Sequence, residues 1–252
     1  MQGAPQHAYV SVPGAARSQT SRVVNDLGRT IISGRLAEGS LLPGDSELIE
    51  RYGVSRTVLR EAFRTLSGKG LVHAKARIGT KVRPRSDWNL FDPSVLVWHA
   101  EQGFSPDFLK HLGEIRLALE PEGAALAAQR RSAQQLEDMR DWLGKMSASG
   151  VSKADFVRAD LGLHLTIAAA AGNPFFVSIS TLIEVALDAM LTASSPTEDP
   201  QRFAISVRDH AGIVTAIAAK DAEAARRHMR AVVQMGIDQS SQALDTAAVP
   251  RR

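Results

Sequence analysis

An aspartate and two histidines in the second half of the chain have the residue types of a divalent-cation site. Asp160 and His164 lie four residues apart in the stretch DLGLH, so on a helix their side chains would project from one face. His210, in RDHAGI, could complete the site from another helix, because carboxylates and imidazoles are common zinc ligands. Alternatively, His164 and His210 are partly buried core histidines with hydrogen-bond partners, and the residues alone leave both interpretations open.

Two arginines of the first half, Arg56 and Arg60, also lie four residues apart, in VSRTVLREAFRTL. On a helix they would share one face, and the planar fork of arginine fits guanine O6 and N7 as well as phosphate oxygens. Thr57 could add a hydrogen bond to a base or a phosphate. The alternative is an ordinary solvated surface on which Arg60 pairs with Glu61.

A third candidate is Arg116, in EIRLALEPEG, which lies among apolar residues of an expected helix. A buried arginine is costly unless it meets an anion, and its fork fits a carboxylate through two hydrogen bonds. This predicts a binding site for a small carboxylate. The alternative is a weak surface pair with Glu120, four residues further along. Asn173, in GNP, is expected to end a helix and, secondarily, to line the same pocket.

The elements that would position the arginine pair are three short helices. Apolar spacing predicts an amphipathic helix over residues 20–33. Two further helices, over 46–52 and 55–67, are expected on either side of a turn at Gly53, with Ser46 and Ser55 as their N-caps. Two such helices joined by a short turn form a helix-turn-helix, whose second helix would carry the arginines.

A small hairpin is expected next, because LVHAKARIGTKVRP alternates apolar and basic residues around Gly79. Its basic residues are Lys75, Arg77, Lys81 and Arg83. Added to the three helices, the hairpin completes a winged helix-turn-helix. The charge distribution agrees: residues 1–86 contain 14 Lys and Arg against 6 Asp and Glu, whereas the remainder contains 16 against 21. A basic first part of this kind predicts binding to a polyanion such as DNA.

The rest of the chain shows no strand pattern and is expected to form an all-helical bundle. Helices are predicted over residues 93–102, 106–131, 133–149, 153–171, 174–193, 200–219 and 221–244. The predicted fold class is therefore mainly α. The predicted domains are a tail over 1–18, a winged helix-turn-helix over 19–86, a linker over 87–93 and the helical domain over 94–247. Trp88, Leu90 and Phe91 are expected to pin the linker.

Composition excludes several classes of protein. The chain has no cysteine, so it has no disulfide framework, no thiolate zinc site and no cysteine nucleophile. No run approaches the ~20 apolar residues of a membrane span, and the first residues lack a secretory pattern. The expected location is the cytoplasm, with no membrane partner.

The run LPGDSELIERYGVSRTVLREAFRTLSGKGLVHAKARIGTKV resembles the winged helix of the GntR family of bacterial transcription regulators. The resemblance implies that Arg56 and Arg60 read bases and grip phosphates, with Ser55 and Thr57 beside them and Gly79 at the wing tip. Many members have Glu-Arg where this chain has Asp45 followed by serine. One cation that would touch the DNA backbone is thus missing, and affinity is expected to depend more on Arg35 and on the wing, including Lys75 and Arg77.

The run RSDWNLFDPSVLVWHAEQGFSPDFLKHLGEIRLALEPEGAALAA resembles the helical FCD effector domain of the FadR-type branch, and most closely its repressors of galactonate and related sugar-acid catabolism. In many such domains an aspartate and three histidines bind zinc, manganese or nickel. Asp160, His164 and His210 match the first three positions, but the fourth falls on Val232. His228, one turn earlier, is a weak candidate for that position. The resemblance implies a metal site completed by the effector, or a metal-free site whose residues hydrogen-bond the ligand.

These observations predict a homodimeric, effector-responsive transcription regulator, most simply a repressor of a sugar-acid or related carboxylate operon. Its two heads would read a pseudo-palindrome in double-stranded DNA. A small carboxylate, such as galactonate or gluconate, would release the DNA. The predicted effector site comprises Arg116, Asp160, His164, Asn173 and His210. The alternatives are a DNA-binding protein without an effector and a metal-dependent enzyme; no obvious general base stands next to the metal candidates.

Overall fold

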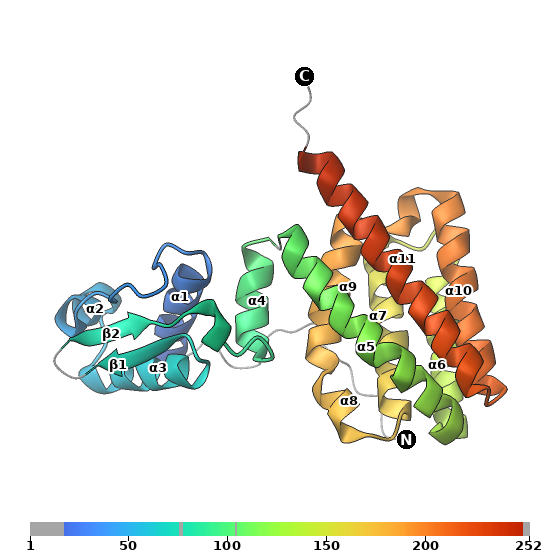
Figure 1. Cartoon of the computed structure of the whole chain (residues 1–252), viewed down its shortest axis with the longest axis horizontal. Helices are drawn as coiled ribbons and strands as arrows, with labels where there is room; N and C mark the ends of the chain where they lie inside the picture. The colour runs from blue at the N-terminus through green and yellow to red at the C-terminus, as the bar shows by residue number, and fades with distance from the viewer. Residues whose placement is uncertain (1–17, 76–77, 104, 249–252) are drawn as a thin grey trace. The chain divides into compact units, whose positions relative to one another are not determined.

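The computed structural model of the chain describes residues 18–75, 78–103 and 105–248 (Figure 1). The chain divides into two compact units, with the division after Gly103. Helices dominate both units, and the described strands form one two-stranded sheet in the first. The prediction of a mainly helical chain that begins with a winged helix-turn-helix is confirmed. Of the predicted tail over 1–18, only Ser18 falls within the described residues.

Three helices form the body of the first unit: α1 (Gln19–Ile32), α2 (Asp45–Tyr52) and α3 (Arg56–Gly68). Ser55 caps α3 as predicted, because its hydroxyl accepts a hydrogen bond from the Val58 amide at 3.3 Å. Gly53 follows the last residue of α2 with a φ of 61°. Glycine adopts this left-handed conformation without steric conflict, so it makes the tight turn that leads into α3.

The start of α2 differs from the prediction that Ser46 caps it. The helix begins at Asp45, after Gly44, and the cap position carries no side chain that could accept a hydrogen bond. Ser46 lies instead in the first turn and is exposed. Asp45 and Glu47 supply negative charge to this turn, which favours the helix N-terminus electrostatically.

The wing is the predicted hairpin. Strand β1 (Val72–Lys75) pairs antiparallel with β2 (Gly79–Val82), and Lys75 faces Gly79 at its tip. Gly79 has a φ of 116°, a region that favours glycine. Leu41, from the segment before α2, forms an isolated bridge with Lys81 of β2. That bridge ties the base of the wing to the helical body of the unit.

A fourth helix, α4 (Pro93–Glu101), packs in the first unit, beyond the predicted boundary at residues 93/94. Its Trp98 is 1% exposed, lies against α1 and donates a hydrogen bond from Nε1 to Asn25 Oδ1 at 3.1 Å. Arg29 of α1 pairs with Glu101, with Nη2 and Oε1 at 2.8 Å. The sequence analysis places this helix in the second domain, because no strand pattern is seen from about residue 94 onward.

The segment before α4, which contains a 3₁₀ turn at Arg85–Asp87, was predicted to be pinned by three apolar side chains. Trp88 is buried and donates a hydrogen bond from Nε1 to the Arg83 carbonyl at 3.1 Å. Leu90 and Phe91 are exposed, so the prediction is wrong for these two residues. One buried indole therefore anchors the segment.

The second unit is a bundle of α5 (Pro106–Arg130), α6 (Ala133–Met146), α7 (Lys153–Ala170), α8 (Pro174–Ser178), α9 (Ser180–Ala193), α10 (Pro200–Ala218) and α11 (Ala222–Ala248). A 3₁₀ turn, Pro196–Glu198, joins α9 to α10. Each corresponds to a predicted helix, except that the helix predicted over 174–193 is interrupted at Ile179, which separates α8 from α9.

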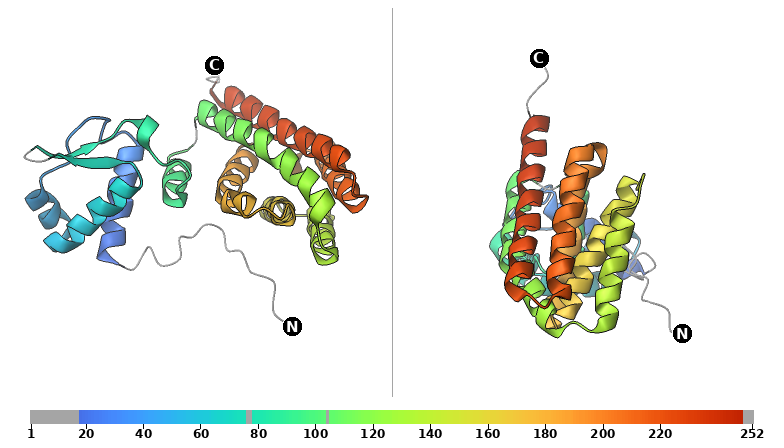
Figure 2. Two further views of the ribbon diagram at one scale, coloured as in Figure 1. Left: turned by 60° about the horizontal axis from the view of Figure 1, so that its bottom comes forward. Right: turned by 90° about the vertical axis from the view of Figure 1, so that its right-hand side faces the viewer.

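Helices α5 and α11 lie side by side over much of their length (Figure 2). Gly113 of α5 permits this close approach, because a Cβ there would lie 2.5 Å from Cγ1 of Ile237 on α11. Among the residues that the structure describes, no helix combines the length and the apolar character that crossing a membrane requires.

The contact between α1 and α4 gives a prediction for stability. A Cβ on Gly28 would lie 2.4 Å from the ring of Trp98, so Gly28→Ala must displace α4 or the indole. We expect the free energy of unfolding to fall by about 1–3 kcal/mol, the usual effect of overpacking. Urea unfolding of the full chain, followed by tryptophan fluorescence and circular dichroism, measures it.

Gly68→Ala is the matched control, because Gly68 also lies in a helix but has no other atom within 4 Å of the position of its Cβ. The substitution is expected to be neutral or to stabilise by up to ~1 kcal/mol through helix propensity. Equal effects of the two substitutions would contradict the tight packing of Trp98 on Gly28.

Candidate nucleic-acid interface and metal centre

Helix α3 presents Arg56 and Arg60 to solvent. Its inner face is formed by the buried side chains of Leu59, Ala62 and Leu66. Within the described part of the chain, neither arginine forms an ion pair or a side-chain hydrogen bond, and Arg60 does not pair with the adjacent Glu61. Both guanidinium groups are therefore available to an external partner.

Other cations of the first unit have acidic partners within the unit. These ion pairs are Arg29–Glu101, Arg51–Asp26, Lys69–Asp92, Arg83–Asp87 and Arg85–Glu38. Seven described Lys and Arg residues of this unit have no acidic partner among the described residues, and five of them lie on α3 and the wing: Arg56, Arg60, Arg64, Lys75 and Lys81. The other two are Arg22, which donates to the Tyr52 carbonyl, and Arg35, which donates to the Ser33 hydroxyl. Most of the unpaired positive charge of the first unit is thus found on α3 and the wing.

The other predicted DNA-contacting residues occupy different positions. Thr57 is exposed in the first turn of α3, whereas the Ser55 hydroxyl is occupied by its capping hydrogen bond. Lys75 is exposed at the tip of the wing. Arg35 is exposed and donates from Nε to the Ser33 hydroxyl at 3.1 Å. Arg77 lies outside the described residues.

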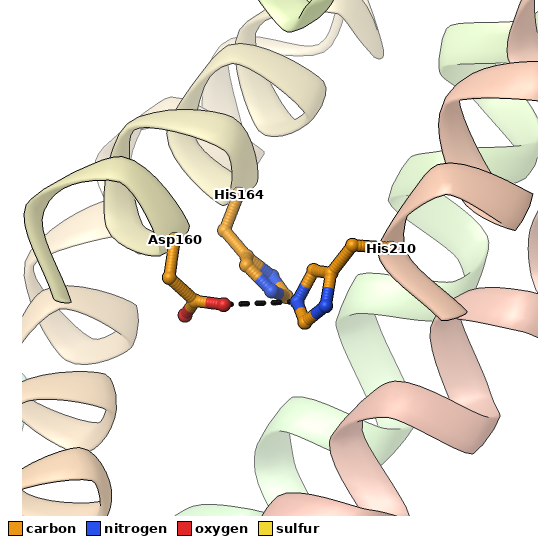
Figure 3. Close-up of side chains that lie close together, drawn as sticks. All are labelled: Asp160, His164 and His210. Atoms are coloured by element: carbon orange, nitrogen blue, oxygen red, sulfur yellow. Dashed lines mark ion pairs between the residues drawn. The ribbon is translucent and has the colours of Figure 1, made fainter. Parts of the chain in front are cut away.

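The second unit brings together the predicted metal-ligating residues. Asp160 and His164 project from α7 toward His210 of α10 (Figure 3). All three are at most 3% exposed. One ligand atom from each can be chosen so that all three atoms lie within 4.8 Å of one another, a separation suited to a shared metal ion. Asp160 Oδ1 and His210 Nε2 lie 2.9 Å apart.

The hydrogen bond at Nδ1 of each imidazole indicates which ring nitrogen carries the proton. His210 Nδ1 lies 2.7 Å from the Ser206 carbonyl oxygen, and His164 Nδ1 contacts a carboxylate oxygen of Glu120. Because both partners are acceptors, each Nδ1 carries a proton. In the neutral imidazoles, each Nε2 then presents a lone pair to the space beside Asp160.

Three buried atoms in this space have no hydrogen-bond partner among the described residues: Asp160 Oδ2, His164 Nε2 and His210 Nε2. A lone pair 2.9 Å from a carboxylate oxygen is repelled unless a proton or a cation lies between them. Burial opposes protonation of His210, but the Asp160 charge outweighs it and raises the His210 pKa. Burial likewise opposes ionisation of Asp160, yet the charge of His210 lowers the Asp160 pKa. The donor set thus fits a divalent cation.

Arg116 forms an ion pair with Glu120, which was the alternative predicted from the sequence. The pair is buried, however, and does not lie on the surface. Arg116 is 2% exposed; its Nε contacts Glu120 Oε1, and its Nη1 lies 3.4 Å from Met190 Sδ. Glu120 is 6% exposed, and its other oxygen contacts His164. Burial opposes its ionisation, but the charge of Arg116 and the hydrogen bonds from His164 and Arg116 prevail and lower the Glu120 pKa to about 2.

From the sequence, Glu120 was considered only as a surface partner of Arg116. Its buried position between Arg116 and His164 was not predicted. A helical stripe on α5 contains the signal. The buried residues along it are Leu109, Leu112, Arg116, Glu120, Ala124 and Ala127. Their spacing of three or four residues places Arg116 and Glu120 on the apolar face, where both must be buried together.

A cavity of about 40 Å³ opens beside these groups. Its polar lining includes Arg116, Asp160, His164 and His210, while Val232 contributes an apolar side chain. At about 10–15 Å³ for each water-sized group, the cavity has room for roughly three such groups. The wall also contains Met190 and Met235, whose flexible side chains can repack to accept a larger ligand.

Two predicted residues do not belong to the cavity lining. Asn173 begins rather than ends a helix: its side chain caps α8 by accepting a hydrogen bond from the Phe175 amide at 3.1 Å. His228 is exposed and lies against Gly212 of α10. It therefore does not replace Val232 as a fourth ligand in this structure.

Gln239 of α11 is a further lining residue that sequence reasoning did not select. Its Oε1 accepts a hydrogen bond from Arg202 Nη2 at 2.9 Å, and the same nitrogen donates to the Ser194 hydroxyl at 2.8 Å. With its oxygen so held, the amide nitrogen of Gln239 is free to donate to a ligand.

Comparison with known proteins finds two family models in this chain. Residues 19–82 match "Bacterial regulatory proteins, gntR family", and residues 111–235 match the FCD domain. The galactonate operon transcriptional repressor of Escherichia coli strain K12 is 30% identical over 210 residues, which are 83% of this chain and 91% of the repressor. The HTH-type transcriptional regulator YieP of the same strain is 33% identical over 223 residues, covering 87% and 95%.

Solved structures show the same fold. The Lar protein, described as controlling expression of the Listeria monocytogenes agr system, superposes with a TM-score of 0.60 at 19% identity. The match covers 90% of this chain and 98% of that one. Escherichia coli McbR/YncC gives a TM-score of 0.50 at 20% identity, covering 89% and 98%.

The convergence of Asp160, His164 and His210 predicts metal-dependent stability. Zinc added to chelator-treated protein should raise the melting temperature, because a ligand that binds only the folded state stabilises it by about 2.7 kcal/mol at 100 times its Kd. The measurement is thermal unfolding of protein purified without a metal-affinity tag.

His210→Ala should abolish this shift, since it removes one ligand from α10. His228→Ala is the matched control: it removes an exposed histidine of α11 and should preserve the shift. A shift of equal size in the His210 variant would show that zinc binds elsewhere.

Proposed function

We propose, on the premise that this chain belongs to the GntR family of bacterial regulatory proteins and carries an FCD domain, that it is a homodimeric repressor released from DNA by a small hydroxycarboxylate. The family makes it a transcriptional repressor and not an enzyme, so the metal-dependent enzyme considered from the sequence is set aside. The observation that carries the effector proposal is the convergence of three unsatisfied buried ligand atoms beside a cavity.

The proposed DNA interface is the N-terminal half of α3 together with the wing. In helix-turn-helix proteins the second helix enters the major groove with its first residues toward base edges, which is where Arg56, Thr57 and Arg60 lie. Ser55 contributes by fixing the start of α3 rather than through a free hydroxyl. Lys75 would contact phosphates. A dimer would place two such units on the half-sites of a pseudo-palindrome.

Three further residues are proposed to take part in the DNA interface. Gly79 would let the wing backbone approach the DNA closely, because glycine has no side chain. Arg77 is proposed as a wing contact from its position in the basic hairpin sequence. Arg35, exposed after α1, would supply a phosphate contact in place of the cation that the chain lacks after Asp45.

For the effector site, Asp160, His164 and His210 would hold one divalent cation, with zinc favoured over manganese or nickel. Such a cation supplies positive charge and coordination positions for oxygen donors. Val232 offers no ligand atom at the place where many FCD domains have a fourth. A carboxylate and a neighbouring hydroxyl of the effector could therefore reach the cation from that side.

Arg116 would bind the same carboxylate. Its Nε is engaged by Glu120, which leaves Nη hydrogens of the fork for a ligand. Gln239 would donate to a hydroxyl further along the effector. An aldonate such as galactonate or gluconate has this order of groups, and the similarity to the galactonate operon repressor supports that class. Its length requires Met190 and Met235 to move, which couples binding to a change in the bundle.

A repressor without an effector is the second candidate. It would explain α3 and the wing, but it would leave the buried polar cluster and its cavity without a role. Because the proposed partner is double-stranded operator DNA, we propose that the protein is cytoplasmic. The two candidates differ in one measurement, the response of the DNA complex to a ligand.

For the DNA interface, we expect Arg56→Ala and Arg60→Ala each to weaken specific operator binding by about 1–3 kcal/mol, as for a lost bidentate base contact. Fluorescence anisotropy with the operator, identified by selection from a DNA library, gives the affinity at fixed salt.

Arg140→Ala serves as the charge-matched control, because Arg140 is an exposed arginine of α6 in the second unit. It should bind the operator as the parent does. Parent-like affinity in both α3 variants would remove this helix from the interface.

For the effector site, galactonate or gluconate should dissociate the operator complex in the presence of zinc. Arg116→Lys keeps a positive charge beside Glu120 but loses the planar fork. We expect operator affinity to stay unchanged and the half-releasing effector concentration to rise at least ~10-fold, equal to about 1.4 kcal/mol. Competition anisotropy over a series of sugar acids measures it.

Arg226→Lys makes the same exchange at a half-buried arginine of α11 outside the cavity lining and should respond like the parent. No release by any sugar acid, with or without zinc, would favour the repressor that lacks an effector.

A further inference from the structure

We propose that Glu120 is a positioning residue that sets the tautomer of His164 and thereby the affinity of the cluster for a divalent cation. This inference rests on the proposed function, because it concerns the same cation. Glu120 is not itself in the candidate ligand set and does not line the cavity. Its effect on the cation must therefore pass through His164.

Both carboxylate oxygens of Glu120 are occupied by donors. Oε1 accepts from Arg116 Nε, one helical turn earlier on α5, and Oε2 accepts from His164 Nδ1 on α7. The group is 6% exposed, so water does not compete for these positions. Because Oε2 can only accept while the carboxyl is ionised, the proton of the neutral imidazole is held on Nδ1.

The consequence appears on the other side of the ring. With the proton on Nδ1, Nε2 of His164 has no hydrogen and faces Asp160 and His210, where it has no hydrogen-bond partner among the described residues. The opposite tautomer would direct an N–H into the space that the cation would occupy. Carboxylates that fix ligating histidines in this way also increase the basicity of the ligand nitrogen.

The arrangement is a poor device for stability alone. An ion pair removed from water gains little over apolar side chains of similar volume, since desolvation offsets the attraction of the charges. The chain nevertheless buries Arg116, Glu120 and His164 together. Arg116 secures the charge and orientation of Glu120, and Glu120 in turn orients His164. The proposed anion-binding residue and the proposed metal ligand are thereby joined through one carboxylate.

Replacement of this carboxylate by an amide has a defined outcome. In Glu120→Gln the amide has one acceptor and one donor end. Arg116 is always a donor, so it should take the amide oxygen. The amide N–H₂ then faces His164 Nδ1, and the imidazole can satisfy it only by moving its proton to Nε2. The lone pair is lost from the metal side.

The test measures zinc affinity by competition with a chromophoric chelator on full-length, tag-free protein. We expect Glu120→Gln to weaken zinc binding ~10–100-fold, the usual effect of removing such a partner. Glu122→Gln is the matched control on the same helix. Glu122 is exposed and pairs with Arg226, so this variant should bind zinc as the parent does.

The tautomer gives a second readout that a merely structural role would not change. Long-range ¹H–¹⁵N spectra of chelator-treated protein, with His164→Gln for assignment, should show the proton on Nδ1 in the parent and on Nε2 in Glu120→Gln. A parent tautomer with the proton on Nε2 would overturn the proposal, even if the variant fails to fold.

The inference and the proposed function fail separately. Zinc affinity of Glu120→Gln within 3-fold of the parent and of Glu122→Gln would overturn the positioning role and leave the metal site intact. A parent that binds no zinc would overturn the metal site, while the tautomer measurement would still decide what Glu120 does.

Discussion

The second unit depends on mutual compensation of buried charge. Arg116 and Glu120 on α5, Asp160 and His164 on α7, and His210 on α10 are all withdrawn from water within one bundle. None of these groups could be buried alone without a large desolvation penalty, so the three helices must meet in a single arrangement. The Nδ1 atom of each histidine has a hydrogen-bond partner, whereas the Nε2 atoms, which face Asp160, have none among the described residues. The interior of the bundle is thus organised around buried ligand atoms that have no hydrogen-bond partner among the described residues.

Contacts between residues of one helix can be predicted from the sequence, whereas contacts between helices that are far apart in the sequence cannot. The spacing of Asp160 and His164 is a property of one helix, and it was predicted. Arg116 and Glu120 have the same spacing, but a pair four residues apart looks alike on a surface and in a core. Their burial follows from the packing of α7, α9 and α11 against α5, which no local pattern contains. For the same reason Gln239, held by Arg202 of another helix, was not foreseen.

The first unit shows the same division between local and distant causes. The Ser55 cap, the Gly53 turn and the hairpin at Gly79 follow from residue types within a few positions and were predicted. The place of α4 was not, because it depends on Trp98 fitting a surface that Gly28 leaves open. The predicted Ser46 cap lies two residues after the observed cap, Gly44, because Asp45 and Ser46 both fit the first turn of α2. Residue types within a few positions therefore predicted the helices and strands of this unit. The packing of Trp98 on Gly28 determines that α4 belongs to it.

The location of most unpaired cations of the first unit on α3 and the wing has a thermodynamic consequence. DNA carries a layer of condensed counterions, and each phosphate that a protein cation neutralises releases some of them into solution. For B-DNA the logarithm of the binding constant falls with the logarithm of salt concentration by about 0.9 for each such phosphate. Cations already paired within the protein contribute little to this entropy. The salt dependence of operator binding would therefore be set mainly by a few side chains of α3 and the wing.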